Sequence, residues 1–231
     1  MFLHIRKTAG TSIVRMAMDH YGHENICSHG DYMGKPPSEL EKFSFISGHF
    51  GFDYAQELMA ERFSFTFLRN PVDRILSLYC FCRTRDPEEF PIYRAAAEND
   101  LDGFLVAASD DDLIRSYISN SQVWCLATGP GLTEIADDGL SPKDRFDCAL
   151  ENAGAFSYIG FLETFDEDAK AIMAALNIPT DASVRHENIT PHKISDADLP
   201  DSTRQLLKEL TQWDQKLYEI LFKKYKGNAR S

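Results

Sequence analysis

The chain has 231 residues, of which 43% are hydrophobic, and a formal net charge of −12 at pH 7. A chain of this length buries roughly 70% of its unfolded surface, so we expect a single domain over residues 1–231. The acidic balance argues against a nucleic-acid binder, because phosphate contacts need a basic face. No apolar run approaches the roughly 18 residues of a membrane span, so none is expected.

The cysteine content indicates a reduced protein rather than a disulfide framework. The number of cysteines is odd, and no two of them have C-x-x-C spacing. We therefore expect a cytoplasmic location. The five residues are Cys27, Cys80, Cys82, Cys125 and Cys148.

Residues 2–22 predict a strand, a turn and a helix. A short apolar run is followed by the turn, and apolar residues then recur at helical spacing from Ile13 up to Gly22, where we expect the helix to end. His4 lies within the first strand and is expected to be a buried histidine rather than a catalyst.

The turn reads K-T-A-G-T-S, so Lys7 precedes the only glycine, Gly10. A Walker loop instead places its lysine after its glycines. A turn of this kind directs backbone N–H groups and a helix N-terminus toward an anion, and its lysine and hydroxyl groups add donors. It is therefore predicted to bind phosphate or sulfate. The candidate residues are Arg6, Lys7, Thr8, Ala9, Gly10, Thr11 and Ser12.

This loop resembles the 5′-phosphosulfate loop of sulfotransferases that use 3′-phosphoadenosine 5′-phosphosulfate (PAPS). The resemblance is to the branch that contains the Golgi carbohydrate (heparan sulfate 2-O-like) enzymes and bacterial relatives. It implies that the loop holds the 5′-phosphate of PAPS, the co-substrate. It also implies that Lys7 neutralises the charge that develops on the leaving nucleotide, a scheme that requires no metal.

Two further core strands are expected at residues 43–47 and 63–68, because both runs are rich in phenylalanine. The first of them leads to Gly48 and His49, at the carboxyl edge where such folds bind ligands. Imidazole, with an ordinary pKa of about 6.5, suits general-base catalysis near neutrality. We interpret His49 as the base that deprotonates the acceptor, with Glu57 and Glu24 as weaker rivals. The resemblance supports this interpretation, because relatives that act on uronic-acid sugars carry a similar glycine–histidine segment and other branches use a glutamate.

The strand at residues 63–68 is followed directly by Arg69. Asn70 is the predicted N-cap of the next helix and Pro71 its first residue. Ser77 lies seven residues after Asn70, two turns along the same side, so Arg69 and Ser77 can approach one anion. The segment 68–79 resembles the 3′-phosphate-binding segment of the same family, in which an arginine and a serine bind the 3′-phosphate of the donor.

The composition turns acidic from about residue 86 to 120. We expect two helices there, at about residues 93–107 and 110–118, with Asp110 as the N-cap of the second. We interpret the acidic side chains as a solvated helical face rather than a metal cluster. This acidic helical insertion is expected to lie near the acceptor site.

Later segments resemble the same family more loosely. They are residues 120–129, and a strand at 156–161 that leads to Glu163. Between them, Ser141 and Pro142 predict the start of a helix. In the family, a loop near residues 184–193 closes over the donor nucleotide, which makes Arg185 and Lys193 candidate donor-binding residues.

Apolar residues near the C-terminus trace a long amphipathic helix. The predicted inward positions are Leu206, Leu210, Trp213, Leu217, Ile220 and Leu221.

Strands that alternate with helices indicate an α/β fold with a central, mostly parallel sheet. The resemblance adds a P-loop-like three-layer sandwich. It implies transfer of a sulfonyl group from PAPS to a hydroxyl or an amine of a carbohydrate or small-molecule acceptor. The acidic composition disfavours a long polyanionic acceptor, which would be repelled overall. Neither the acceptor nor the oligomeric state follows from the sequence.

Two other classes of protein stay open at this stage. A small-molecule or nucleoside kinase with a variant phosphate loop would need a magnesium carboxylate at a strand end and a second lysine. A non-catalytic nucleotide-binding interaction protein would keep the pocket without turnover. A zinc site is not expected, because the spacings match no standard site. The residues that would form it are His20, His23, Cys27 and His29.

Overall fold

The computed structural model describes residues 1–128, 139–179 and 194–227. In these residues five strands form one all-parallel sheet in the order β2-β3-β1-β4-β5. This confirms the predicted α/β fold. The strands are β1 (Phe2–Leu3), β2 (Ile26–Cys27), β3 (Phe45–Gly48), β4 (Phe65–Leu68) and β5 (Tyr158–Phe161).

The strands are buried on both faces, and their side chains alternate between two hydrophobic clusters. Phe2 and Phe65 belong to one cluster and stack with ring centroids 4.7 Å apart. Leu3 and Leu68 belong to the cluster on the opposite face. Because successive strand side chains point to opposite faces, a continuous apolar run is what a sheet covered on both sides requires.

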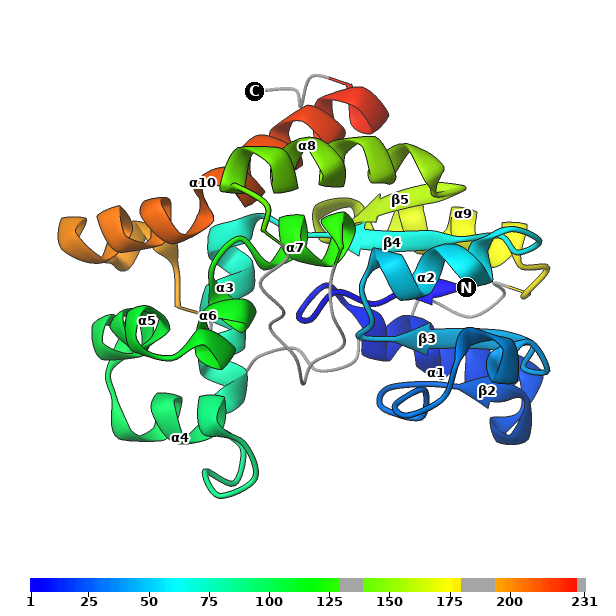
Figure 1. The fold of residues 1–231 in the computed structure, drawn as a ribbon, viewed down its shortest axis with the longest axis horizontal. Coiled ribbons are helices and arrows are strands. Elements are labelled where there is room, and N and C mark those ends of the chain that lie inside the picture. The colour runs from blue at the N-terminus through cyan, green and yellow to red at the C-terminus, as the bar shows by residue number, and fades with distance from the viewer. Residues whose placement is uncertain (129–138, 180–193, 228–231) are drawn as a thin grey trace.

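Helices cover both faces of the sheet and make the fold three-layered (Figure 1). On the face of Phe2 lie α1 (Gly10–Tyr21) and α9 (Phe165–Ala175). On the face of Leu3 lie α2 (Phe52–Met59), α7 (Ser121–Ala127) and α8 (Pro142–Asn152), together with the second half of α10 (Asp201–Lys226).

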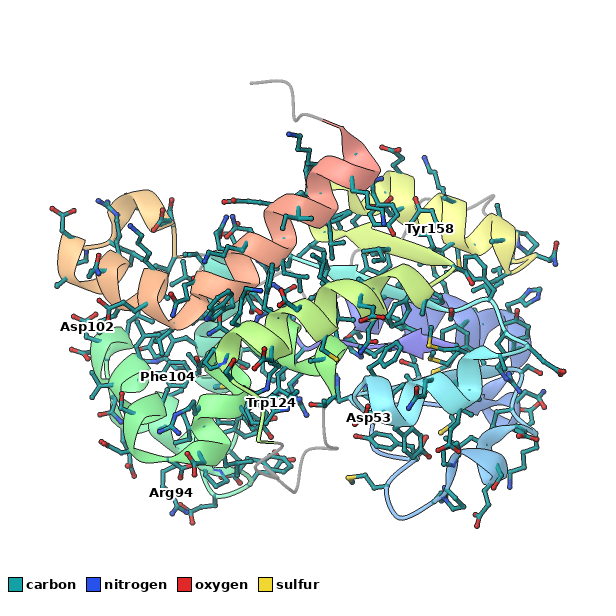
Figure 2. The ribbon with its side chains drawn as sticks, turned by 45° about the horizontal axis from the view of Figure 1, so that its top comes forward. Asp53, Arg94, Asp102, Phe104, Trp124 and Tyr158 are labelled. Carbon is teal, nitrogen blue, oxygen red and sulfur yellow. The ribbon has the colours of Figure 1, made fainter. Side chains whose placement is uncertain are left out.

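A second group of helices packs beside the sheet around a core of its own, on the left in Figure 1. The helix α3 leads from β4 into this group. The first half of α10 completes the group, and Thr203 there donates a hydrogen bond to Asp102 of α5 (2.6 Å; Figure 2). The helices are α3 (Pro71–Cys82), α4 (Pro91–Glu98), α5 (Leu101–Asp110), α6 (Asp112–Ile118) and α10 (Asp201–Lys226).

The prediction of one helix over residues 93–107 was wrong, because the chain forms α4 and α5 there. Asn99 is extended, and the Asp100 carboxylate accepts a hydrogen bond from the Gly103 N–H and starts a new helix.

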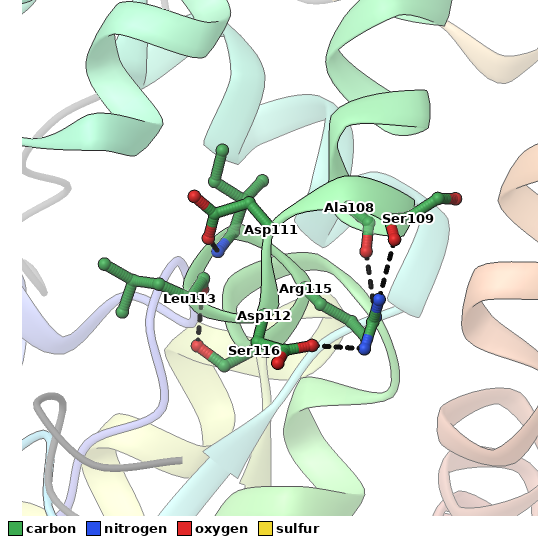
Figure 3. Close-up of polar contacts among 8 residues, drawn as sticks. Ala108, Ser109, Asp111, Asp112, Leu113, Arg115 and Ser116 are labelled. Atoms are coloured by element: carbon green, nitrogen blue, oxygen red, sulfur yellow. Dashed lines mark hydrogen bonds and ion pairs between the residues drawn. The ribbon is translucent and has the colours of Figure 1, made fainter.

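The N-cap of α6 was also predicted one residue too early. It is Asp111 rather than Asp110 that accepts from the Ile114 N–H (Figure 3). Asp110 is instead the last residue of α5. Arg115 of α6 donates to the carbonyl groups of Ala108 and Ser109 at the end of α5, so the two helices are tied together across this junction.

The predicted caps around the sheet are confirmed. Asn70 accepts hydrogen bonds from the N–H groups of Val72 and Asp73 at the start of α3. Ser141 accepts from the Asp144 N–H at the start of α8. Both helices have proline at their first position, as expected.

The long helix α10 is bound near its middle by Asn120, the residue before α7. The Asn120 N–H donates to the Leu210 carbonyl, and its side-chain oxygen accepts from the N–H groups of Trp213 and Asp214. Asn120 thus joins the start of α7 to the backbone of α10.

The face of α10 was predicted only in part: Leu206, Leu210 and Trp213 are half-buried, and the buried Leu207 was not predicted. Leu217 and Leu221 are buried as expected, but Ile220 is 43% exposed. Among the described residues, no helix has both the length and the apolar character needed to cross a membrane.

Candidate active site

The loop between β1 and α1 has a strained backbone at two residues that are not glycine. Lys7 has φ 67° and Ala9 has φ 69°, both in the left-handed region. Such conformations cost roughly 1–3 kcal/mol each and persist only where the surrounding structure imposes them. Observed strain of this kind is frequent at ligand-binding loops, so the loop is a candidate site.

The strained loop leads into α1, whose N-terminus has no side-chain cap. Ala9 precedes α1 and provides no side-chain cap, and the first turn contains no acidic residue. The first N–H groups of a helix lack intrahelical partners and carry a partial positive charge. Gly10, Thr11 and Ser12 therefore begin a helix that suits an anion.

Thr8 is arranged differently from the prediction of a hydroxyl donor. Its side chain is fully buried, and its hydroxyl donates to the Ile5 carbonyl at 2.7 Å. The hydroxyl therefore stabilises the turn itself, and any contact of Thr8 with an anion falls to its backbone.

Only glycine fits at position 10, because the ring of His4, which follows β1, lies against this position. A Cβ atom at this position would lie 1.8 Å from Nε2 of His4. The His4 ring is buried and lies between Phe2 and His49, with ring centroids 5.1 and 4.3 Å away. Burial lowers the pKa of His4 to about 3, so His4 is a neutral packing residue, as expected.

Lys7 lies over the ring of Phe81, with its Nζ 4.0 Å from the ring centroid. Burial, together with repulsion from Arg69, lowers the pKa of Lys7 to about 8. Within the described ranges no carboxylate lies at ion-pair distance from the Lys7 ammonium. The lysine is thus a cation that is available to a ligand.

Arg69 joins the second motif to this loop. Its guanidinium donates to the Lys7 carbonyl at 3.1 Å, across 62 residues of sequence. Both backbone groups of Arg69 are held by Gln122, whose amide accepts from the N–H at 3.0 Å and donates to the carbonyl at 2.9 Å. The two motifs predicted to bind the two ends of one nucleotide therefore meet at the carboxyl edge of the sheet.

Ser77 lies on the same side of α3 as Phe81, which follows it by four residues. Ser77 is 8% exposed. The Lys7 ammonium lies over the Phe81 ring. Ser77 therefore lies on the side of α3 that meets the Lys7 side chain.

Glu163 closes the edge of the site at the end of β5. Its carboxylate accepts from the Asn70 N–H at 2.7 Å and also hydrogen bonds to the Tyr218 side chain. Glu163 and Asp73 raise the pKa of Arg69, while burial, which is the larger effect, lowers it. Among the described residues neither carboxylate forms an ion pair with the Arg69 guanidinium.

His49 follows β3 at the same edge and is half-buried. Its Nδ1 lies 2.6 Å from the His4 carbonyl oxygen. Because a carbonyl only accepts, Nδ1 carries the proton and Nε2 keeps its lone pair. Burial lowers the pKa of His49 well below 6.5, and repulsion from His4 and from Arg6 acts in the same direction. The imidazole is neutral at pH 7, as a proton acceptor must be.

Arg6, the residue before Lys7, has different neighbours from the rest of the loop. Its guanidinium carbon lies 4.6 Å from the ring centroid of Tyr117. The side chains that act on its charge are those of Tyr117, Cys125, Tyr32 and Tyr93. Arg185 and Lys193, the other two candidate donor-binding residues, lie outside the described residues.

Sequence analysis missed Gln122. It lies in a segment that the resemblance singles out, but nothing in the sequence shows that its amide holds the backbone of Arg69.

The site lies at the carboxyl edge of the parallel sheet of an α/β protein, where Lys7 and Arg69 meet beside the uncapped N-terminus of α1. Comparison with protein families is consistent with this class: residues 1–229 match the sulfotransferase family. The chain therefore belongs to the sulfotransferase family, whose members are enzymes that use PAPS as co-substrate and act on an acceptor. No curated protein matches the chain.

No group of three or more histidine, cysteine, aspartate or glutamate side chains in the described part of the chain is arranged to hold a metal ion.

Proposed function

We propose that this protein transfers the sulfonyl group of PAPS to a hydroxyl group of a small-molecule or carbohydrate acceptor. One observation carries the proposal. Lys7 and Arg69 meet beside the open N-terminus of α1, and the described residues offer neither of them a carboxylate partner. In a chain with a net charge of −12, two such cations indicate an anionic ligand.

The residues present fit the two ends of the nucleotide. Lys7, the N–H groups at Gly10 and Thr11, and Ser12 bind the 5′-phosphate. Arg69 and Ser77 bind the 3′-phosphate, and the contact between Arg69 and the Lys7 carbonyl sets the relation between the two ends.

The transfer is an in-line displacement at sulfur, in which positioning and charge stabilisation dominate. The bond from sulfur to the acceptor oxygen forms as the bond from sulfur to the 5′-phosphate oxygen breaks, and the electron pair leaves with adenosine 3′,5′-bisphosphate. Lys7 stabilises the charge that develops on this leaving oxygen. His49 takes the acceptor's proton on Nε2, because Nδ1 is already bonded to the His4 carbonyl.

The nearest test of the ligand is thermal stabilisation by adenosine 3′,5′-bisphosphate. A ligand at 100 times its Kd stabilises the folded state by about 2.7 kcal/mol. We expect this shift with the bisphosphate and none with ATP plus Mg²⁺, which a kinase would prefer. Arg69→Gln should reduce the shift. Arg94→Gln, which removes an exposed arginine paired with Glu88, should not. Stabilisation by ATP and Mg²⁺ alone would contradict the proposal.

Transfer of labelled sulfate tests the role of His49. His49→Ala should lower kcat by roughly 10²–10⁴, the usual contribution of a general base, and should remove the acid limb of the pH profile. In kcat/KM, which reports the free enzyme, that limb lies below pH 6.5 because the pKa of His49 is lowered. His23→Ala, which removes an exposed histidine, serves as control. An unchanged pH profile in His49→Ala would exclude His49 as the base.

A further inference from the structure

Arg6 is a half-buried cation to which the proposed binding of PAPS gives no role. Apart from the Tyr117 ring, its guanidinium has no hydrogen-bond or ion-pair partner among the described residues. The groups that act on its charge are tyrosines and a cysteine, which are neutral at pH 7, and burial lowers its pKa. An arginine has five donors in a planar fork and is costly to bury without a partner.

The Tyr32 side chain lies at the end of β3 and also lacks a partner. A Cβ atom at Gly48 would lie 2.8 Å from its ring, and its ring centroid is 5.2 Å from that of Phe50, the residue after His49. Its hydroxyl is buried and accepts or donates no hydrogen bond within the described residues, although the residue is only 4% exposed. Burial raises the pKa of Tyr32 to about 12, and the charge of Arg6 is the next strongest influence on it. The hydroxyl is therefore a neutral donor within electrostatic range of the Arg6 guanidinium. A buried polar group of this kind costs free energy unless a ligand satisfies it.

These two donors stand near the proposed base. The charge of Arg6 lowers the pKa of His49, which places the guanidinium within electrostatic range of the imidazole. Lys7, in contrast, is surrounded by Phe81, Arg69 and Arg85. The loop therefore presents successive cations to different surroundings, Lys7 to the side of Arg69 and Arg6 to the side of His49.

We propose that Arg6 and Tyr32 bind a carboxylate on the acceptor, so that the preferred acceptor is a small hydroxy compound with one anionic group. This inference rests on the proposed function. A planar guanidinium pairs with a carboxylate through two parallel hydrogen bonds, and the tyrosine hydroxyl adds a third. One arginine suits one anionic group, whereas the net charge of −12 disfavours a long polyanion.

A bound carboxylate also affects the base. It offsets the positive charge of Arg6, which is one of the influences that lower the pKa of His49. Acceptor binding therefore raises the pKa of His49 toward neutrality and strengthens it as a base.

The test offers matched pairs of acceptors with saturating PAPS. One pair is methyl β-D-glucuronide and methyl β-D-glucoside, and the other is 4-hydroxyphenylacetate and its methyl ester. In at least one pair, we expect kcat/KM to be at least tenfold higher for the acceptor with a carboxylate than for its neutral partner. Arg6→Gln should abolish this preference, mainly through KM, and Arg6→Lys should keep part of it. Tyr32→Phe should lower kcat/KM only for the acceptors with a carboxylate. Arg94→Gln should leave kcat/KM unchanged for both members of each pair.

Two measurements separate this site from a structural role and from failure of the proposed function. Arg6→Gln should leave thermal stability unchanged or raised, because it removes an unpaired charge, and the pKa of His49 measured by NMR should rise. Three outcomes would overturn the inference alone, provided that adenosine 3′,5′-bisphosphate stabilises the protein. They are equal use of both members of each pair, a preference that survives Arg6→Gln, and no transfer to any probe. Absence of that stabilisation would instead overturn the proposed function.

Discussion

Lys7 combines two unusual properties in one residue: a left-handed backbone and a pKa of about 8. The backbone conformation directs the side chain onto Phe81, where burial disfavours its charged form. The protonated fraction of such a lysine rises when an anion binds beside it. Its electrostatic contribution is therefore greatest when the donor is bound.

The pKa of Lys7 predicts the alkaline limb of activity. Lys7 is protonated below pH 8 and loses its charge above it, so kcat/KM for PAPS should fall as pH rises through about 8. The limb of kcat should lie at higher pH, because the bound anion favours the charged lysine. Lys7→Arg should move both limbs beyond pH 10. Lys7→Ala should lower kcat by roughly 10²–10³. A limb that stays near pH 8 in Lys7→Arg would show that another group titrates.

Gly10→Ala is predicted to destabilise the protein because its Cβ would lie 1.8 Å from the His4 ring. That ring is packed between Phe2 and His49 and has little room to move. Overpacking of this kind costs about 1–3 kcal/mol, which urea unfolding can measure. The matched control is Gly154→Ala, because nothing lies within 4 Å of a Cβ there. Equal unfolding midpoints for the two variants would contradict the assigned role of His4.

At the scale of elements, α7 is a support for the candidate site rather than a part of it. The Asp214 carboxylate, from α10, accepts from the N–H groups of Gln122 and Val123 at the start of α7. Gln122 in turn holds the backbone of Arg69. A buried acidic group at a helix N-terminus is electrostatically favourable, and here it fixes the direction of the helix.

Gln122→Ala is predicted to weaken donor binding without removing any group that contacts the donor. Loss of its two hydrogen bonds leaves the Arg69 backbone unpaired, at a cost of roughly 1–3 kcal/mol. We expect the Kd for adenosine 3′,5′-bisphosphate to rise about tenfold, with little change in the pH profile of kcat. Calorimetry measures the first quantity. Gln215→Ala, on the exposed face of α10, is the control, and equal affinities in the two variants would refute the support role.

The elements of this protein could largely be predicted from local sequence. The strands follow from phenylalanine-rich runs, and α3 and α8 from their asparagine, serine and proline signals. Two of the errors, the split at Asn99 and the cap at Asp111, arise where several acidic residues compete as caps. The site could be predicted only in part. Contacts such as Gln122 with Arg69 and Arg6 with Tyr117 join distant segments, and no local pattern records them.

At the scale of the whole molecule, α10 connects two hydrophobic cores. Leu207 in its first half packs in the core of α3 to α6, and Leu217 and Leu221 in its second half pack on the sheet. Figure 2 shows α10 passing along α8 between these two regions. Asn120 binds the backbone of α10 between the two halves.

Asn120 variants test how much this junction contributes to stability. Asn120 has φ 45°, which glycine adopts without strain. Asn120→Gly loses only the acceptor for two N–H groups, at about 2–4 kcal/mol, and Asn120→Ala adds about 1 kcal/mol of backbone strain. Asn177, an exposed residue at φ 56°, is the matched control, and Asn177→Gly should be close to neutral. A more stable Asn120→Ala than Asn120→Gly would contradict this account.

The position of Asp214, well after both anion-binding motifs in the sequence, has a consequence for synthesis. A ribosome makes the Lys7 loop and Arg69 first, and the carboxylate that orders α7, and through it the backbone of Arg69, is translated only later. A nascent chain in which α10 is still inside the exit tunnel therefore has both anion-binding motifs but cannot hold them in register. The donor nucleotide can then act as a folding ligand only after translation has passed α10.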